Sequence, residues 1–369
     1  MSETGDNRGE AGGTGWIRSL LSFESIGGWS AEQRRALTEN ARHIRSMFVE
    51  RRSPRLALVG ARDLGVFDVL GAAFADVPSA DDAERKEYLG HGRWHDYEMG
   101  CEELSVLDVR RGHGDRLSLK ALDEDVPDVV ILVWPADDRG RQRTLDDYEK
   151  FVRAVRVTGE IATPTVAVFD NRGRDESARE MERDLRDRLG RTAVPEETLA
   201  FVALTEGESL AEELVWAAPA PARLSLARAS RHPGPKRRAA EDLIQTSAGL
   251  AATFAAAPLP VADIVPITGV QVAMIASLAH LGGRDFSLTS VGEFVFAAGL
   301  NVGAGYAARA VARTLMGLVP AAGAVISTGM ATTATAGLGR AAAAYFFDRE
   351  ASVPEVAGEQ AARTGGRVE

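Results

Sequence analysis

The chain has 369 residues, which is enough for one to three domains with a substantial buried core. Its hydrophobic content of 45% and charged content of 26% are typical of an ordered globular protein. A net charge of −10 argues against general nucleic-acid binding, which usually needs a basic face. The one cysteine, Cys101, excludes an intrachain disulfide and suits a reducing compartment.

The polar, glycine-rich residues 1–15 are typical of a disordered tail. They lack the charged-then-apolar pattern of a secretory signal, so we expect a cytoplasmic protein. Residues 16–50 carry apolar side chains at helical spacing and predict N-terminal helices. The polar residues 348–369 predict a mobile tail at the other end.

Residues 55–217 alternate between short apolar runs and helical stretches. The apolar runs predict buried strands at Leu56–Val59, Leu104–Leu107, Val129–Val133, Thr165–Phe169 and Leu199–Leu204. The other stretches predict helices at Val66–Ala73, Leu145–Val157, Glu176–Leu189 and Gly207–Val215. This alternation indicates an α/β domain with a parallel-rich sheet covered on both faces. Ligands of such sheets bind beyond the carboxyl ends of the strands.

The first predicted strand leads into a loop framed by two glycines, as in the phosphate-binding pattern Gly-x-x-x-x-Gly-Lys-[Ser/Thr]. The lysine and hydroxyl positions hold Val66 and Phe67, which neither neutralise phosphate nor hold magnesium. Asp63 adds negative charge, and Arg62 offsets only part of it. The candidate nucleotide-contacting residues of this degenerate loop are Gly60, Ala61, Arg62, Asp63, Leu64, Gly65, Val66 and Phe67.

Further candidate contacts follow in the order found in GTPases. Asp108 ends an apolar run where a magnesium-supporting aspartate is expected, although the segment 108–112 is one residue longer than Asp-x-x-Gly. Asn171 and Asp175 follow a later strand, at the wrong spacing for the base-reading Asn-Lys-x-Asp. Residues 203–207 fall where the last guanine-contact loop is expected.

On these motifs, residues 55–217 resemble an Era-like GTPase domain with degenerate motifs, which implies the Era/Ras-like P-loop fold. Residues 239–347, rich in alanine and glycine, predict an all-α helical domain and are similar to domain of unknown function 697, the YcjF-like domain found on some Era-like GTPases. The segments that carry this second resemblance are Asp263–Thr268, Gln271–Ile275, Leu318–Gly323 and Thr335–Ala342.

Residues 218–238 carry prolines and clustered arginines and predict an extended basic linker, with binding to anionic lipid head groups as the alternative. Helix breaks in the following domain are predicted at Pro258, Pro260, Pro266, Gly282-Gly283 and Pro320. Thr314–Gly339 is uncharged and exceeds the roughly 20 residues of a membrane span. Its small residues give little drive for insertion, so we expect a helical bundle that associates with a membrane, with spanning helices as the alternative.

The stretch before the second predicted strand reads as a switch-like loop. His91 and His95, with Asp96, Cys101 and His113 nearby, are a weaker candidate for a metal site, because glycines there disfavour a helix. The aromatic and apolar side chains of this loop either anchor a partner or pack onto the sheet; they are Trp94, Tyr97 and Met99.

The sequence thus predicts a pseudo-GTPase: an interaction scaffold with no catalytic residues, no metal and no cofactor, attached through its helical domain to a membrane or a partner. We expect an unidentified protein partner, a membrane surface at the inner face of the cell membrane as a second candidate, and no nucleic acid. One alternative is a divergent GTPase switch that uses Arg62, Asp108 and residues 171–175 in altered roles, with GTP or GDP and Mg²⁺ as ligands. Another is an integral membrane protein with a regulatory soluble domain.

Overall fold

The fold comes from a computed structural model. It describes residues 52–78, 92–110, 117–135, 138–158, 163–169, 178–190, 199–255, 264–300 and 328–348, apart from residues 63, 118 and 124. The predictions for the tails, for the N-terminal helices and for breaks at Pro258, Pro260 and Pro320 lie outside these residues.

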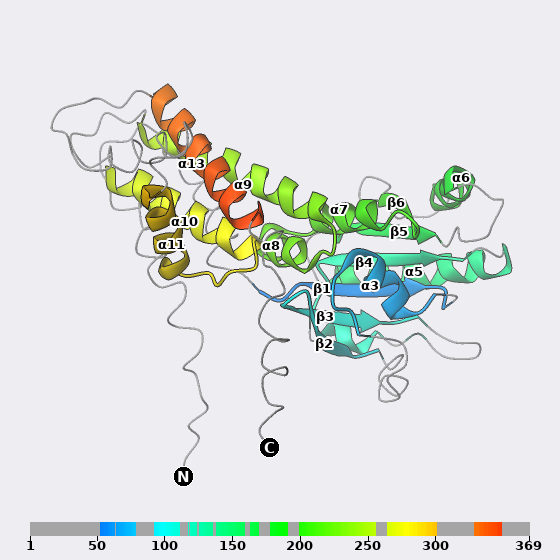
Figure 1. The fold of residues 1–369 in the computed structure, drawn as a ribbon. Coiled ribbons are helices and arrows are strands. Elements are labelled where there is room, and N and C mark those ends of the chain that lie inside the picture. Colours follow the sequence, from blue (N-terminus) through cyan, green and yellow to red (C-terminus); the bar gives the residue numbers. More distant parts are fainter. Residues whose placement is uncertain are drawn as a thin grey trace, which may run out of the picture.

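Within the described chain, six strands form one sheet in the order β2-β3-β1-β4-β5-β6 (Figure 1). All neighbouring strands are parallel except β2, which runs antiparallel to β3 at the edge. The five predicted strands are confirmed with small shifts at their ends. The strands are β1 (Arg55–Gly60), β2 (Trp94–Met99), β3 (Glu102–Asp108), β4 (Val129–Trp134), β5 (Thr165–Phe169) and β6 (Leu199–Ala203).

Strand β2 corrects the prediction of a switch-like loop for residues 94–99. Polar residues alternate with aromatic ones there, and only Met99 is fully buried, so the sequence carries a weak strand signal. The hairpin turns at Gly100 and Cys101, whose φ values are 55° and 62°. Positive φ at both positions is typical of a two-residue hairpin turn. Gly100 is also needed for space, because a Cβ there would lie 2.7 Å from the backbone of Ala229.

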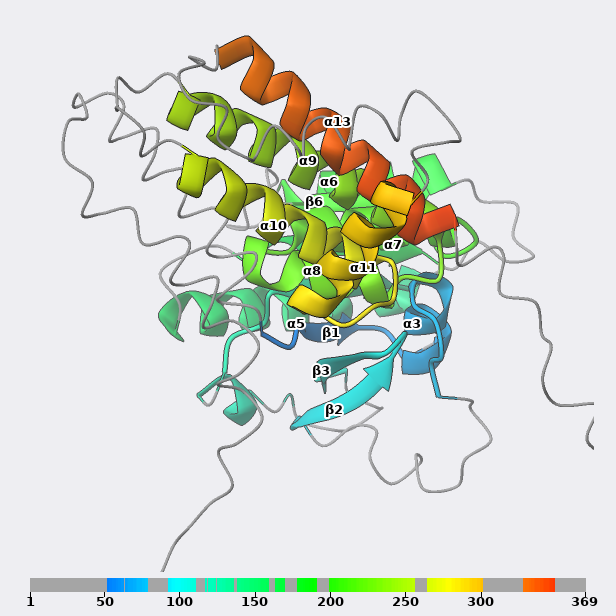
Figure 2. The ribbon, with the colours of Figure 1, turned by 60° about the vertical axis from the view of Figure 1, so that its left-hand side comes forward.

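Helices cover both faces of the sheet (Figure 2). Helices α5 (Asp138–Thr158) and α6 (Ala178–Leu189) bury their apolar sides on the face that presents Ala57 and Val59. Helices α3 (Val66–Ala73), α7 (Gly207–Ala217) and α8 (Ala220–Ala229) bury theirs on the face of Leu56 and Leu58. A short 3₁₀ helix, η1 (Lys120–Asp123), lies against α5. The covered, mostly parallel sheet confirms the expected α/β architecture.

Residues 218–238 are mostly helical, so the expected extended linker is wrong in its conformation. Helix α8 and the first turns of α9 (Pro233–Ala255) occupy this segment. The prolines begin helices: Pro219 is the N-cap of α8 and Pro233 is the first residue of α9. A missing backbone N–H costs little at these positions, because the first turn has no partner for it.

Beyond α8, the described chain is helical, with α9, α10 (Ile264–Leu281), α11 (Leu288–Leu300) and α13 (Thr328–Asp348) (Figure 1). A Cβ on Gly339 would lie 2.7 Å from Ile244 and 2.9 Å from Met274, so α13 packs closely on α9 and α10. The same buried cluster contains Met274 and Leu58, so the core of the helices is continuous with the core on one face of the sheet.

The predicted break at Gly282-Gly283 is confirmed, because α10 ends at Leu281. The break predicted at Pro266 is wrong, because this proline lies in the first turn of α10, where proline is tolerated. Among the helices that the structure describes, none combines the length and the apolar character needed to cross a bilayer. Most of the predicted segment Thr314–Gly339 lies outside the described residues.

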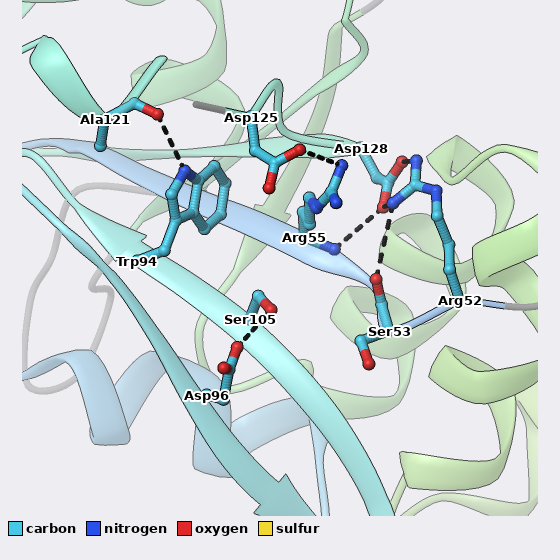
Figure 3. Close-up of polar contacts among 9 residues, drawn as sticks. All are labelled: Arg52, Ser53, Arg55, Trp94, Asp96, Ser105, Ala121, Asp125 and Asp128. Atoms are coloured by element: carbon cyan, nitrogen blue, oxygen red, sulfur yellow. Dashed lines mark hydrogen bonds and ion pairs between the residues drawn. The ribbon is translucent and has the colours of Figure 1, made fainter. Parts of the chain in front are cut away.

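Polar contacts fix β1 to its neighbours at the amino end of the strand (Figure 3). The Arg52 guanidinium binds the Asp128 carboxylate, and the backbone N–H of Arg55 donates to the same carboxylate at 2.9 Å. The Arg55 side chain pairs with Asp125 at 2.8 Å. These contacts lie at the opposite end of β1 from Gly60, so they position the strand without filling its carboxyl end.

Candidate functional site

The loop that follows β1 has the strand–loop–helix setting of a phosphate-binding loop. Gly60 ends β1 with a φ of 109°, and a Cβ at this position would collide with the carbonyl oxygen of Val133. The backbone N–H of Ala61 donates to that same oxygen at 2.9 Å. Glycine is therefore required by the backbone conformation and by the close approach of β4.

A buried guanidinium closes this loop. Arg110, just beyond the end of β3, is only 4% exposed. Its Nη1 donates to the carbonyl oxygens of Leu64 at 2.8 Å and of Ala61 at 3.3 Å. Its Nε and Nη2 donate to the two carboxylate oxygens of Asp108 at 2.9 and 3.1 Å. Arg110 therefore joins the loop to the aspartate that was expected to support magnesium. We call the described loop residues 60–62, 64 and 65, together with Asp108 and Arg110, the cradle.

The backbone groups that face the centre of the cradle are the opposite of those in a phosphate-binding loop. Such a loop turns backbone N–H groups toward the phosphates. Here the carbonyl oxygens of Ala61 and Leu64 face a cation. Both carboxylate oxygens of Asp108 are also engaged by Arg110. A triphosphate with its metal would have to displace these buried, charge-assisted hydrogen bonds.

The first turn of α3 carries a further carboxylate, that of Asp68. Asp68 Oδ2 accepts a hydrogen bond from the backbone N–H of Gly65 at 3.0 Å. A negative charge at this helix end opposes the binding of an anion there. Arg62 is exposed, and its Nε donates to the carbonyl oxygen of Arg110 at 2.6 Å. Arg62 thus holds the backbone that carries Arg110.

The residues at the lysine and hydroxyl positions serve packing. Val66 is 2% exposed and belongs to the core between α3 and the sheet. Phe67 packs edge-on against Tyr97 of β2, with ring centroids 5.4 Å apart. Neither side chain carries a group that binds phosphate or magnesium.

The structure brings together part of the predicted site. Ala61, Leu64 and Asp108 meet around Arg110, whereas Gly60 lies against Val133 of β4. Three predicted residues lie outside the described part of the chain: Asp63, Asn171 and Asp175. The expected last guanine-contact loop packs against α3, since a Cβ on Gly207 would collide with the carbonyl oxygen of Ala72.

Arg110 was not predicted as a site residue, although the sequence contains features that point to it. A buried aspartate at the end of a strand needs a cation nearby. The loop lacks its lysine, and Arg110 stands two residues after Asp108. The extra residue in the segment 108–112 marks the same place, because the chain departs there from the expected Asp-x-x-Gly.

The side chains expected in a switch-like loop pack on the sheet instead. Trp94 Nε1 donates to the carbonyl oxygen of Ala121 at 3.1 Å (Figure 3), and Met99 is fully buried. Within the described ranges, no group of three or more His, Cys, Asp or Glu side chains is placed to hold a metal ion. His91 and His113 lie outside those ranges.

A second buried ionic cluster joins the sheet to the helices; we call it the joint. Arg228 Nη1 of α8 donates to Glu102 Oε1 of β3 at 2.7 Å, and it lies 3.2 Å from His280 Nδ1 of α10. His280 Nε2 lies 3.0 Å from the same Glu102 oxygen. Because Arg228 can only donate, Nδ1 accepts in this contact, and a neutral His280 then carries its proton on Nε2.

No known family model matches this chain, and no curated protein matches it significantly. The resemblances to Era-like GTPases and to the YcjF-like domain therefore stay predictions. The fold defines an α/β domain with a mostly parallel sheet, followed by helices.

Proposed function

We propose that this chain is a pseudo-GTPase: a degenerate P-loop domain that neither holds nor hydrolyses GTP and acts as an interaction scaffold. The observation that supports this proposal is the position of Arg110, which is buried within the cradle. Its guanidinium donates hydrogen bonds to the carbonyl oxygens of Ala61 and Leu64 and to both carboxylate oxygens of Asp108.

The energetic cost of opening the cradle supports the same proposal. Breaking a buried ion pair by removing one partner costs about 3–5 kcal/mol. A nucleotide that displaced Arg110 would lose a comparable amount of binding free energy, equivalent to roughly a hundredfold or more in affinity. The chain offers no lysine or hydroxyl at positions 66 and 67 to compensate for this loss.

A scaffold also requires a fixed arrangement of its parts. The joint links β3, α8 and α10, and one apolar core runs from the sheet into the helices.

The proposed attachment to a membrane rests on the sequence of the helical domain. Arg228 of the basic segment is held inside the protein, and Arg223 stacks on Trp216 at 4.9 Å, so fewer charges are left for lipid head groups.

Fluorescently labelled GTP and GDP provide the test, titrated into the full chain with Mg²⁺ and again with EDTA. We expect no saturable binding in the micromolar range. Saturable, magnesium-dependent micromolar binding to the wild-type chain would refute the proposal.

The Arg110→Ala variant tests whether Arg110 is the group that prevents nucleotide binding. A folded variant that gains nucleotide affinity would identify Arg110 as the closing group. Arg228→Ala is the matched control, because it removes a largely buried, ion-paired arginine outside the cradle and should leave nucleotide affinity unchanged.

The alternative is a divergent GTPase, which the position of Asp108 at the end of β3 favours. It predicts that purified protein hydrolyses GTP and that Asp108→Ala abolishes the activity. Because both Asp108 oxygens are engaged by Arg110, we consider this alternative the weaker one.

A further inference from the structure

A cavity of about 480 Å³ lies beside α3 and opens to solvent. Its volume falls within the range of small-molecule sites. The apolar part of its lining comes from Phe67, Phe74, Val77 and Pro78, and the charged part from Asp68, Asp76 and Arg231. The cavity thus combines apolar walls with charges of both signs.

The side chains of Asp68, Asp76 and Arg231 are exposed. Among the residues that the structure describes, none of the three forms an ion pair with another. Arg231 Nη1 donates to the carbonyl oxygen of Gly71 at 2.7 Å, which positions the guanidinium beside α3. Asp68 uses Oδ2 for the Gly65 amide and keeps Oδ1 for another donor.

The backbone at Asp76 adds a separate observation. Its φ of 52° lies in the left-handed region, where aspartate is one of the few non-glycine residues commonly found. Here the conformation places a carboxylate in the lining of the cavity.

We propose that this cavity binds a free α-amino acid with an apolar side chain. The ammonium group pairs with the Asp68 and Asp76 carboxylates, and the carboxylate pairs with Arg231. The side chain packs on the walls formed by Phe67, Val77 and Pro78. A zwitterion presents a charge of each sign to a lining that carries both signs, which a ligand of one charge sign does not. This inference does not depend on whether the cradle binds nucleotide.

The test is isothermal titration of the full chain with L-phenylalanine and two analogues that each lack one charge. Phenethylamine lacks the carboxylate, and 3-phenylpropionate lacks the ammonium group. We expect saturable binding of L-phenylalanine and a loss of roughly tenfold or more with each analogue. Absence of saturable binding by L-phenylalanine and L-leucine overturns the proposal. Equal binding of phenethylamine also overturns it, since the site would then recognise a cation only.

Two variants locate the binding in the cavity. Asp76→Gly removes a carboxylate at a position whose φ suits glycine, so the fold should tolerate it. Arg231→Gln removes the cation. Each should weaken L-phenylalanine binding about tenfold or more, whereas the exposed Asp187→Asn on α6 should not change it. Binding that is unchanged in both cavity variants places the ligand elsewhere and rejects the proposal.

Discussion

The cradle contains a buried arginine and the joint a largely buried one, and the two arginines have different roles. Arg110 binds a carboxylate two residues away and the carbonyls of a nearby loop, so its contacts determine the conformation of that loop. Arg228 binds Glu102, which lies 126 residues away, and thereby joins helix α8 to strand β3. One arginine thus closes a site, whereas the other holds two parts of the molecule together.

The difference shows how the same interaction type serves two purposes. A buried charge pair contributes little net stability compared with an apolar contact of similar size, yet it is costly to break. Such a pair therefore specifies which arrangement is adopted. In the cradle it specifies a loop that presents carbonyls, and in the joint it specifies the placement of the helices.

The largest expected effect comes from Arg110→Ala. The substitution leaves Asp108 buried without a counter-charge and removes the donor from two loop carbonyls, so we expect a loss of about 4 kcal/mol in the free energy of unfolding. Urea denaturation measures the loss, and hydrogen exchange should increase chiefly in residues 60–65. The double variant with Asp108→Ala should lose less than the sum of the two single variants, because the pair acts as a unit. A loss below about 1 kcal/mol would contradict the role assigned to Arg110.

Arg228→Ala should come next, with a loss of about 3 kcal/mol. The effect is smaller because the Arg228 side chain is 14% exposed, compared with 3% for Arg110, so water can partly replace its contacts. Hydrogen exchange should increase across α8 and α10 and leave the cradle protected. Increased exchange limited to α8 alone would show that the cluster does not join the sheet to α10.

Tyr148 is a buried ionisable residue outside both the cradle and the joint, so it serves as a reference for the two arginine variants. Burial raises the pKa of its hydroxyl to about 12, while its hydrogen bond to Thr165 opposes that shift. A raised folded-state pKa favours the neutral form, so the stabilisation is complete below the unfolded pKa near 10 and is lost as pH rises through 12. We expect a loss on the order of 2–3 kcal/mol between pH 10 and pH 12.

Urea denaturation at a series of pH values measures this loss, and Tyr148→Phe should remove most of its pH dependence. Equal pH dependence in the variant would assign the alkaline loss to other groups. The comparison separates the cost of ionising a buried neutral group from the cost of breaking a buried ion pair.

The smallest effect is expected at an exposed ion pair, Arg340 with Glu241, which links α13 to α9 at 2.9 Å. The hydrogen bond from Arg340 lowers the pKa of the Glu241 carboxyl, with a further contribution from Gln245. A lowered folded-state pKa adds stability above the unfolded pKa and loses it as pH falls through the folded value. Arg340→Ala should cost less than about 1 kcal/mol at neutral pH by urea denaturation. A cost equal to that of Arg228→Ala would show that burial does not explain the difference between these ion pairs.

Much of the sheet could be predicted because its inner strands are buried on both faces. Val129–Trp134 and Thr165–Phe169 are continuous apolar runs, and short runs of this kind between helical stretches are typical of the inner strands of a parallel sheet. Strand β2 could not be predicted in the same way, since one side of an edge strand faces solvent and its sequence is mixed. The helical conformation of residues 220–229 was also missed, because prolines and arginines are equally typical of linkers.

By itself, the sequence determined the order of strands and helices, the glycine frame after β1 and the absence of a lysine and a hydroxyl at its end. These features depend on residues that are neighbours in the chain or follow a local period. Only the tertiary structure decided that Arg110 lies inside the loop, that the loop carbonyls face it, and that Glu102 meets Arg228 and His280. Those contacts depend on how β3 pairs with β1 and how the helices pack on the sheet, and no local pattern records that arrangement.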